Sequence, residues 1–376
     1  MSKKIFILTG EPSGDKLAAK VISKLKQADE NIKFLSVGGE HLKALGIQSL
    51  YELKEITYLG FTKVFLNIFK IKKKINETAN KIIEFDPDIL FSVDSPDFTF
   101  RVAKKVKAIK PSIKTIHFVA PQIWVWREGR VKQLKYFLDH ILLLFPFEKK
   151  YFDLEGIEST FTGHPLLEDQ NSNNVDISSF IKNDKRIISI YPGSRLSEIE
   201  VLIPILFQFI KKINQKYDDL FFAFHSTSEY FELIEKRINE EGFKNCIALY
   251  DAKVKSEVLK SSLFAVAKSG TISLEICNAK IPSIIIYKMN MINFFIVKML
   301  IKVKFANIIN IAADEEIIPE LLQKDCNAKN IFNKVDEFLT NPDLSKNQIN
   351  KFQKIIKNFK TDKSTDLATS VLINSL

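Results

Sequence analysis

The chain has 376 residues, of which 46% are apolar and 27% are charged. This composition excludes a disordered chain, and the length favours two domains over a single core. The formal net charge of +10 favours an anionic partner, such as nucleic acid, a phosphorylated substrate or an acidic membrane. The three cysteines, Cys246, Cys277 and Cys326, are far apart, which indicates a reducing cytoplasm rather than disulfides or a zinc site. We expect no signal peptide and no membrane-spanning helix, because no uncharged apolar run reaches about 18 residues.

The first predicted strand and helix are joined by a turn that contains two glycines. An apolar strand over Lys4–Thr9 is followed by Gly-Glu-Pro-Ser-Gly-Asp at 10–15 and by a helix over 16–27. A second strand follows at 32–37, and this alternation predicts a parallel sheet with ligands at the carboxyl ends of its strands. The glycine spacing matches neither a dinucleotide fingerprint nor a P-loop, so it does not support those ligands.

The segment 58–75 has a basic amphipathic pattern with bulky aromatic residues. Lysines recur at helical spacing on one side, and apolar side chains fill the other. This pattern suits a helix lying in a membrane interface, but a domain helix packed on a sheet has a similar stripe, and both alternatives stay open. A second apolar helix with lysines is predicted over 291–304. The predicted membrane-contacting residues are Phe61, Phe65, Ile68, Phe69, Lys70, Lys74, Phe294, Phe295 and Lys298.

Four acidic residues at predicted strand ends of the N-terminal half are candidates for a general base. Asp94 ends the predicted strand at 88–94 and Asp97 follows it, whereas Glu11 and Asp15 lie in the first turn. We expect Asp15 to complement the dipole of the next helix, and Asp94 to belong to its strand and be buried. Asp97 follows a proline that stiffens the turn, so it is the first choice and Glu11 the second. The alternative is that an aspartate of this turn caps the next helix, which is predicted to begin near residue 99.

Two later turns of the N-terminal half also carry candidate ligand-binding residues. Trp124, Trp126 and Arg127 fall together after the predicted strand at 113–119, and such a cluster suits the wall of a cleft. His164 either contacts a ligand or holds the neighbouring backbone, and the second alternative is favoured. The polar segment 169–184 is predicted to link two domains.

The C-terminal half repeats the alternation and carries two small turns suited to a nucleotide. One strand ends in Pro-Gly-Ser-Arg at 192–195, which offers backbone N–H groups and a guanidinium to a diphosphate. A later strand is followed by Ser-Gly-Thr at 269–271 and by a helix start, where N–H groups suit phosphate. Glu275, about one helical turn further on, is suited to sugar hydroxyls. The alternative is that a hydroxyl of this turn merely caps the helix.

Six turns occur in the order and spacing of the lipid-A-disaccharide synthases, and the chain resembles that family up to about Leu322. The turns are Gly-Glu-Pro-Ser-Gly-Asp at 10–15, Ser-Pro-Asp-Phe at 95–98, Pro-Gln-Ile-Trp-Val-Trp-Arg at 121–127, Gly-His-Pro-Leu at 163–166, Pro-Gly-Ser-Arg at 192–195, and Ser-Gly-Thr at 269–271 with Glu275. Pro12 stands where alanine is expected. The segment 306–308 lacks an expected proline, which leaves the assignment of Asn307 open.

The resemblance implies an α/β fold of two Rossmann-like domains facing a cleft, which is the GT-B glycosyltransferase architecture. It implies an acceptor-binding, membrane-facing domain at 1–168, onto which helices at 345–376 pack back, and a UDP-sugar-binding domain at 185–344. The implied activity is inverting transfer from UDP-2,3-diacylglucosamine to 2,3-diacylglucosamine 1-phosphate (lipid X), which gives UDP and lipid A disaccharide 1-phosphate. No metal and no cofactor is expected.

The same resemblance implies residue roles. Asp97 is the expected base with Glu11 as the second choice, and Arg195 and the 269–271 turn neutralise the leaving UDP. The expected UDP-binding residues are Gly193, Ser194, Arg195, Ser269, Gly270, Thr271, Glu275 and Asn307. The expected acceptor-side residues are Ser13, Gly14, Trp124, Arg127 and His164.

The expected partners are the two acylated substrates and the inner leaflet of the inner membrane, to which a cytoplasmic protein binds peripherally. A homodimer stays an open expectation, and nucleic acid is not expected. One alternative is a UDP-sugar epimerase of the same fold, which acts on a soluble substrate and should lack the basic amphipathic helices. A nucleic-acid-binding protein would need aromatic residues interleaved with its basic stripe, whereas here the two are segregated.

Overall fold

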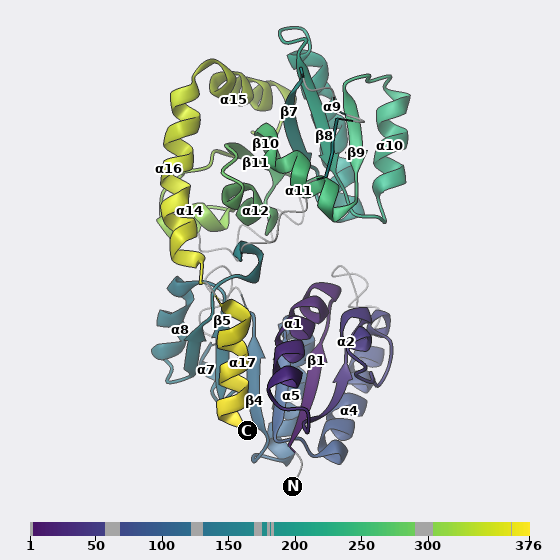
Figure 1. Ribbon diagram of the computed structural model, residues 1–376, viewed down its shortest axis with the longest axis vertical. Helices are drawn as coiled ribbons and strands as arrows, with labels where there is room; N and C mark the ends of the chain where they lie inside the picture. Colours follow the sequence, from purple (N-terminus) through teal and green to yellow (C-terminus); the bar gives the residue numbers. More distant parts are fainter. Residues whose placement is uncertain are drawn as a thin grey trace. The chain divides into compact units, whose positions relative to one another are not determined.

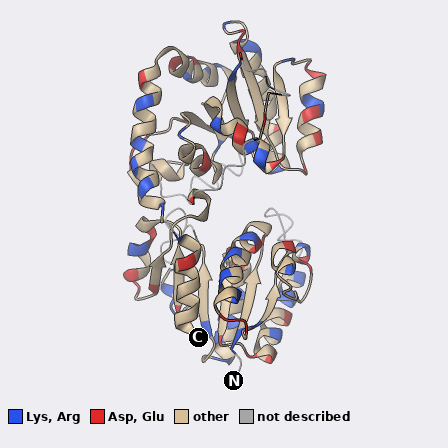
Figure 2. Ribbon diagram, in the orientation of Figure 1, with Lys and Arg blue, Asp and Glu red and all other residues tan. Residues whose placement is uncertain are grey.

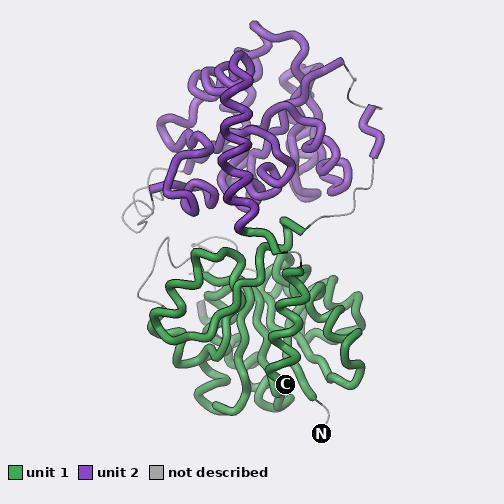
Figure 3. The backbone as a smooth tube through the Cα atoms, turned by 60° about the vertical axis from the view of Figure 1, so that its left-hand side comes forward, with its two compact units in different colours: residues 1–168, 359–376 green, residues 169–358 purple. Residues whose placement is uncertain are grey.

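The structure, a computed structural model, describes residues 3–56, 68–121, 131–168, 175–178, 181, 184–289, 304–361 and 363–376. The chain forms two compact units: unit 1 comprises Met1–Glu168 and Phe359–Leu376, and unit 2 comprises Asp169–Asn358 (Figure 3). The C-terminal segment therefore returns to unit 1, and this return begins at Phe359 rather than at residue 345.

Unit 1 is built on a six-stranded parallel sheet with the strand order β2-β1-β3-β4-β5-β6 (Figure 1). Its strands are β1 (Lys4–Thr9), β2 (Lys33–Val37), β3 (Ile89–Val93), β4 (Lys114–Phe118), β5 (His140–Leu143) and β6 (Glu158–Phe161). Its α-helices are α1 (Pro12–Ala28), α2 (Glu40–Ala44), α4 (Ile68–Phe85), α5 (Pro96–Ile109), α7 (Val131–Leu134), α8 (Lys149–Asp153) and α17 (Ser364–Ser375). Three 3-10 turns lie at Leu53–Glu55, Pro146–Glu148 and Pro165–Leu167. The central strands read as apolar runs because helices cover both faces of the sheet, and Ile5, Phe6 and Ile7 are fully buried.

Unit 2 repeats this architecture with the strand order β12-β11-β10-β7-β8-β9. Its strands are β7 (Arg186–Tyr191), β8 (Leu220–His225), β9 (Cys246–Leu249), β10 (Ser262–Lys268), β11 (Ser283–Tyr287) and β12 (Glu320–Leu322). Its helices are α9 (Leu196–Ile213), α10 (Phe231–Glu240), α11 (Ala252–Lys260), α12 (Ile272–Asn278), α14 (Ile308–Ala313), α15 (Ala328–Thr340) and α16 (Pro342–Phe359). The buried side of α9, including Leu206 and Phe209, shares one core with Phe222 and Phe224 of β8.

The predicted α/β fold with two Rossmann-like units is confirmed. Charged residues gather on the helices, and the strands of both sheets are largely uncharged (Figure 2). The start of the first helix differs from the prediction. Helix α1 begins at Pro12 rather than Lys16, because the fixed φ and missing N–H of proline suit the first turn of a helix. The C-terminal region consists of helices, of which α16 has 18 residues.

Candidate active site

The two glycines of the first turn in unit 1 are required by a neighbouring turn of the same unit. A Cβ atom on Gly10 would lie 2.4 Å from Ser95 Cβ, and one on Gly14 would lie 3.1 Å from Val93 O. The turn after β1 and the turn after β3 therefore lie so close together that a side chain at Gly10 or Gly14 would meet the neighbouring turn. The space that these glycines open is filled by protein, so their presence does not by itself indicate a ligand.

The turn after β3 contains two consecutive residues in the left-handed region. Asp94 has a φ of 57° and Ser95 a φ of 47°, which is uncommon for non-glycine residues. Asp94 follows the last residue of β3 instead of belonging to the strand as predicted. Burial raises the pKa of Asp94, while hydrogen bonds from the Ser95 N–H and the Ser13 hydroxyl lower it. This conformation aims the following residues, Pro96 and Asp97, into the first turn of α5.

Asp97 and Glu11 both lie exposed at the carboxyl edge of the sheet in unit 1. Asp97 is in the first turn of α5, and Glu11 is the N-cap residue of α1. The N-cap residues of these helices, Glu11 for α1 and Ser95 for α5, make no side-chain cap hydrogen bond. Both residues are exposed, and a general base must be accessible to the hydroxyl group that it deprotonates.

Asp15 lies in the first turn of α1, where its charge suits the helix dipole as predicted, but its hydrogen bonds go to another helix. It is 1% exposed, and its two carboxylate oxygens accept hydrogen bonds from Gly39 N at 2.7 Å and His41 N at 2.8 Å. Gly39 is the N-cap residue of α2, so Asp15 supplies the acceptor for the start of that helix instead of its own. With both oxygens occupied in this way, Asp15 is a structural residue.

His164 forms hydrogen bonds with the backbone of its own unit, in agreement with the favoured alternative of a structural role. Its Nδ1 atom accepts from Leu166 N at 3.2 Å, and its backbone N–H donates to Phe359 O at 3.2 Å. Burial lowers the pKa of His164 to about 4, so the ring is neutral. Gly163, with a φ of 81°, lies against Thr361, and these contacts dock the returning C-terminal segment. Of the other predicted acceptor-side residues, Trp124 and Arg127 lie outside the described residues.

The Pro-Gly-Ser-Arg turn of unit 2 is tied to the end of β10 by an ion pair that sequence reasoning missed. Glu198 Oε2 accepts from Ser194 N at 3.2 Å, and Glu198 Oε1 lies 2.9 Å from Lys268 Nζ. Gly193 has a φ of 114° and packs against the Glu198 side chain, which explains the glycine. Arg195 is exposed at the N-cap of α9. The only sequence signal for Glu198 is an acidic residue in the first turn of a predicted helix.

The Ser-Gly-Thr turn at 269–271 is not explained by helix capping. Thr271 makes no side-chain cap hydrogen bond, and Ser269 Oγ instead donates to Ala306 O at 2.7 Å. A Cβ atom on Gly270 would meet no atom of the described residues within 4 Å, so this turn is open on that side. Glu275 is exposed one turn further on, and it contributes after burial to the raised pKa of Tyr191, so it faces the end of β7.

Asn307 lies beside this turn although the expected proline is absent. Its Oδ1 atom accepts from Ile309 N at 2.8 Å and caps α14, while the backbone N–H groups of Ala306 and Asn307 donate to Glu320 at 2.7 and 2.9 Å. The Asn307 Nδ2 donor is buried and has no partner among the described residues. Glu320, which sequence reasoning missed, thus fixes Asn307 so that an amide donor adjoins the 269–271 turn.

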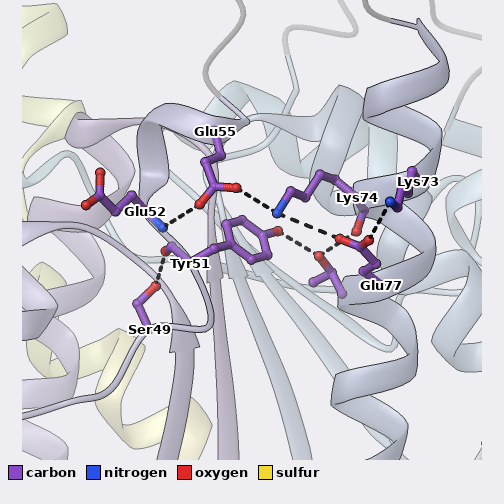
Figure 4. Close-up of polar contacts among 8 residues, drawn as sticks. Ser49, Tyr51, Glu52, Glu55, Lys73, Lys74 and Glu77 are labelled. Atoms are coloured by element: carbon purple, nitrogen blue, oxygen red, sulfur yellow. Dashed lines mark hydrogen bonds and ion pairs between the residues drawn. The ribbon is translucent and has the colours of Figure 1, made fainter.

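One lysine of helix α4 that was predicted to face the membrane, Lys74, instead contacts residues of unit 1. Lys74 Nζ lies 2.7 Å from Glu55 Oε2, 3.7 Å from Glu77 Oε2 and 4.1 Å from the centre of the Tyr51 ring (Figure 4). The Tyr51 hydroxyl in turn bonds Thr78 Oγ1 at 2.6 Å, and burial raises the pKa of Tyr51 to about 12. Lys74 therefore holds α4 against the neighbouring residues of unit 1, and its prediction as a membrane-contacting residue is wrong.

The start of α4 presents a different surface. Phe69 is 86% exposed, and the neighbouring Lys70 is exposed as well, whereas Ile75 on the same helix is buried in the core. The middle of α4 therefore packs on its unit, as the domain-helix alternative predicts, and the membrane alternative stays a prediction for the exposed start of the helix. The remaining predicted membrane-contacting residues, Phe61, Phe65, Phe294, Phe295, Lys298 and the side chain of Ile68, lie outside the described part of the chain. Within that part, no helix has the length and apolar character needed to span a bilayer.

Comparison with known proteins identifies relatives over nearly the whole chain. A family model described as lipid-A-disaccharide synthetase matches residues 5–372. A lipid-A-disaccharide synthase from Rickettsia bellii is 38% identical over 363 residues, which cover 94% of this chain and 93% of that protein. One from Rhodospirillum centenum is 32% identical over 351 residues, which cover 92% of this chain and 87% of that protein.

Similar solved structures come from two enzyme classes. A UDP-GlcNAc 2-epimerase from Neisseria meningitidis bound to UDP-GlcNAc has a TM-score of 0.67 at 14% identity, covering 99% of this chain and 100% of that chain. A glycosyltransferase from Rickettsia africae has a TM-score of 0.59 at 13% identity, covering 99% and 98%. Likeness at such identities shows the GT-B fold alone and does not separate the classes. The sequence relationships do separate them, and the chain belongs to the lipid-A-disaccharide synthetase family.

Proposed function

We propose that this chain, a glycosyltransferase of lipid A biosynthesis, transfers diacylglucosamine from UDP-2,3-diacylglucosamine to the 6-hydroxyl of 2,3-diacylglucosamine 1-phosphate with inversion. The products are the β-1,6-linked disaccharide 1-phosphate and UDP. Family membership over residues 5–372 is the observation that carries this proposal.

Unit 2 is the proposed UDP-sugar site. As the bond from the donor sugar to UDP breaks, negative charge develops on the diphosphate, and fixed positive groups and donors stabilise it. Three features support this placement: the exposed Arg195, the open 269–271 turn, and the Asn307 Nδ2 donor, which has no partner among the described residues. Glu275 is the proposed acceptor for sugar hydroxyls. The other members of the proposed set are Gly193 and Ser194, which shape and present the first turn.

Unit 1 is the proposed acceptor site, with Asp97 as the general base. Asp97 takes the proton from the acceptor hydroxyl while that oxygen attacks the anomeric carbon and UDP leaves with the bonding electrons. A positioned base typically contributes about 10²–10⁴-fold in rate. Its exposure at the start of α5 supports this choice over Asp15, whose oxygens are both occupied by backbone donors. Glu11 is the second choice, and Ser13 and Gly14 complete the proposed acceptor side.

The acylated substrates lead us to propose peripheral binding at the inner leaflet of the inner membrane. The exposed Phe69 and the lysines around it at the start of α4 support this, because apolar insertion and attraction to anionic lipids add together. Lys74 is excluded from this surface.

Incubation of the protein with both acylated substrates, followed by mass analysis, tests the proposed function. The expected product is a tetraacylated disaccharide monophosphate, formed with one equivalent of UDP. Failure to form it, together with interconversion of a soluble UDP-sugar by the protein alone, would establish the epimerase alternative.

A further inference from the structure

His225, the last residue of β8 in unit 2, carries a buried polar atom with no hydrogen-bond partner in the described part of the chain. The residue is 4% exposed, and its ring stacks on Tyr191 with the centroids 4.2 Å apart. Its Nε2 atom lies 2.8 Å from Ser189 Oγ, but its Nδ1 atom has no hydrogen-bond partner among the described residues. Buried polar atoms are almost always paired, so this one requires an explanation.

A chain of hydrogen bonds determines which ring nitrogen carries the proton. Ser262 Oγ lies 2.7 Å from Val258 O, and because a carbonyl only accepts, the single hydroxyl hydrogen of Ser262 is used there. Ser189 Oγ lies 2.7 Å from Ser262 Oγ and must therefore donate to it. Because the Ser189 hydroxyl hydrogen is donated to Ser262, Ser189 Oγ can only accept from His225 Nε2. The proton of the neutral ring is therefore on Nε2.

The ring has no second proton to place on Nδ1. Burial first, and the nearby Lys255 charge second, hold the pKa of His225 at about 3. Nδ1 is therefore a fixed hydrogen-bond acceptor with an unused lone pair. Burial alone does not produce this state. His117 of β4 is equally buried, yet its Nε2 donates to Val119 O at 3.1 Å and its Nδ1 accepts from Ser92 Oγ at 2.8 Å.

We propose that His225 Nδ1 accepts a hydrogen bond from the nucleoside part of the bound UDP-sugar, either from a ribose hydroxyl or from the imide N–H of uracil. This inference rests on the proposed function. A phosphate oxygen that carries no proton cannot satisfy a lone pair, so the diphosphate is the wrong partner. The nucleoside offers donors that the diphosphate lacks.

The position of His225 in the sheet agrees with this partner. The 269–271 turn follows β10, and β8 is two strands away across β7. At about 4.8 Å between neighbouring strands, the two positions are roughly 10 Å apart, which leaves room for the diphosphate at one and the nucleoside at the other. Glu275 and Lys255 influence each other and the Tyr191–His225 pair electrostatically, so a carboxylate acceptor and a cation adjoin the same place.

The binding test compares the wild-type protein with His225→Phe, which keeps a ring against Tyr191 but removes the acceptor. Calorimetry with UDP should show a loss of about tenfold in affinity, the effect of one hydrogen bond, whereas inorganic pyrophosphate should bind both proteins equally. Three analogues each lack one candidate donor: 2′-deoxy-UDP, 3′-deoxy-UDP and N3-methyl-UDP. The wild-type protein should bind the analogue that lacks the donor to His225 about tenfold more weakly than UDP. The analogue that the His225→Phe variant no longer distinguishes from UDP identifies the donor.

A second measurement uses only the wild-type chain, so it does not depend on the variant folding. In ¹⁵N-histidine NMR, the Nδ1 signal of His225 should stay unprotonated and shift on addition of UDP, but not of pyrophosphate. Protonation of Nδ1 by UDP would place phosphate there and overturn the inference, and an unchanged signal would mean that only water fills the position. Wild-type protein that binds no UDP would refute the proposed function itself, whereas UDP binding that ignores His225 refutes this inference alone.

Discussion

Glu148 gives unit 1 a pH-dependent stability that can be measured separately from catalysis. The side chain is 1% exposed, and its Oε2 atom accepts from Leu144 N and Phe145 N, both at 3.0 Å. Burial raises the pKa of Glu148 from its ordinary value of 4.5 to about 8, although the two N–H groups act in the opposite direction. Between these two pKa values, folding is therefore accompanied by uptake of a proton. The contribution of Glu148 to the free energy of unfolding is most favourable at low pH, where the side chain is protonated in both the folded and the unfolded state.

The sign and size follow from this difference. The contribution of Glu148 to the free energy of unfolding is complete below pH 4.5 and is lost as the pH rises through 8. At about 1.4 kcal/mol per pH unit between the two pKa values, the loss is at most about 5 kcal/mol, and relaxation of the site makes a few kcal/mol the realistic size. Glu148→Gln keeps an acceptor oxygen for the two N–H groups and cannot titrate in this range.

The assay is urea unfolding between pH 4.5 and 9, followed by tryptophan fluorescence, because both tryptophans of the chain belong to the sequence of unit 1. The stability difference between wild type and Glu148→Gln should change by a few kcal/mol across this range, with the wild type losing more as the pH rises. Titrations common to both proteins cancel in the difference. Parallel pH profiles for the two proteins would refute the reasoning.

Three further predictions concern the proposed site. Asp97→Asn should lower turnover about 10²–10⁴-fold with UDP affinity unchanged in calorimetry, and near-normal turnover would transfer the role to Glu11 for testing. Arg195→Ala should weaken UDP binding roughly 10- to 100-fold through loss of a charge-assisted contact, and an unaltered affinity would mean that the diphosphate lies elsewhere. Phe69→Ser should reduce binding to anionic vesicles, whereas the matched control Leu154→Ser, also exposed in unit 1 at 82%, should not. Equal vesicle binding by both variants would remove the start of α4 from the lipid-contacting surface.

Local sequence patterns were sufficient for the strands but not for the partners of the site residues. A strand buried on both faces, such as β1, is visible as an apolar run, and the rule that ligands gather at carboxyl ends places the turns. The partners of Asp15 were missed because Gly39 and His41 belong to the next βα unit. Glu320 was missed for the same reason: its carboxylate holds the 306–307 backbone through contacts that no periodic pattern encodes.

The fold alone does not choose between transfer and epimerisation, because both begin with a bound UDP-sugar and need similar donors in unit 2. The difference lies in what else the chain must supply. Transfer to an acylated acceptor requires a group that deprotonates a hydroxyl and a surface that meets lipid. For these two roles we propose two exposed residues of unit 1, Asp97 at the start of α5 and Phe69 at the start of α4. Changes in unit 2 should therefore alter UDP affinity, whereas changes at Asp97 or Phe69 should leave UDP bound and remove transfer or membrane binding. An epimerase would turn over a UDP-sugar without a second substrate, so dependence of turnover on the acylated acceptor separates the two classes.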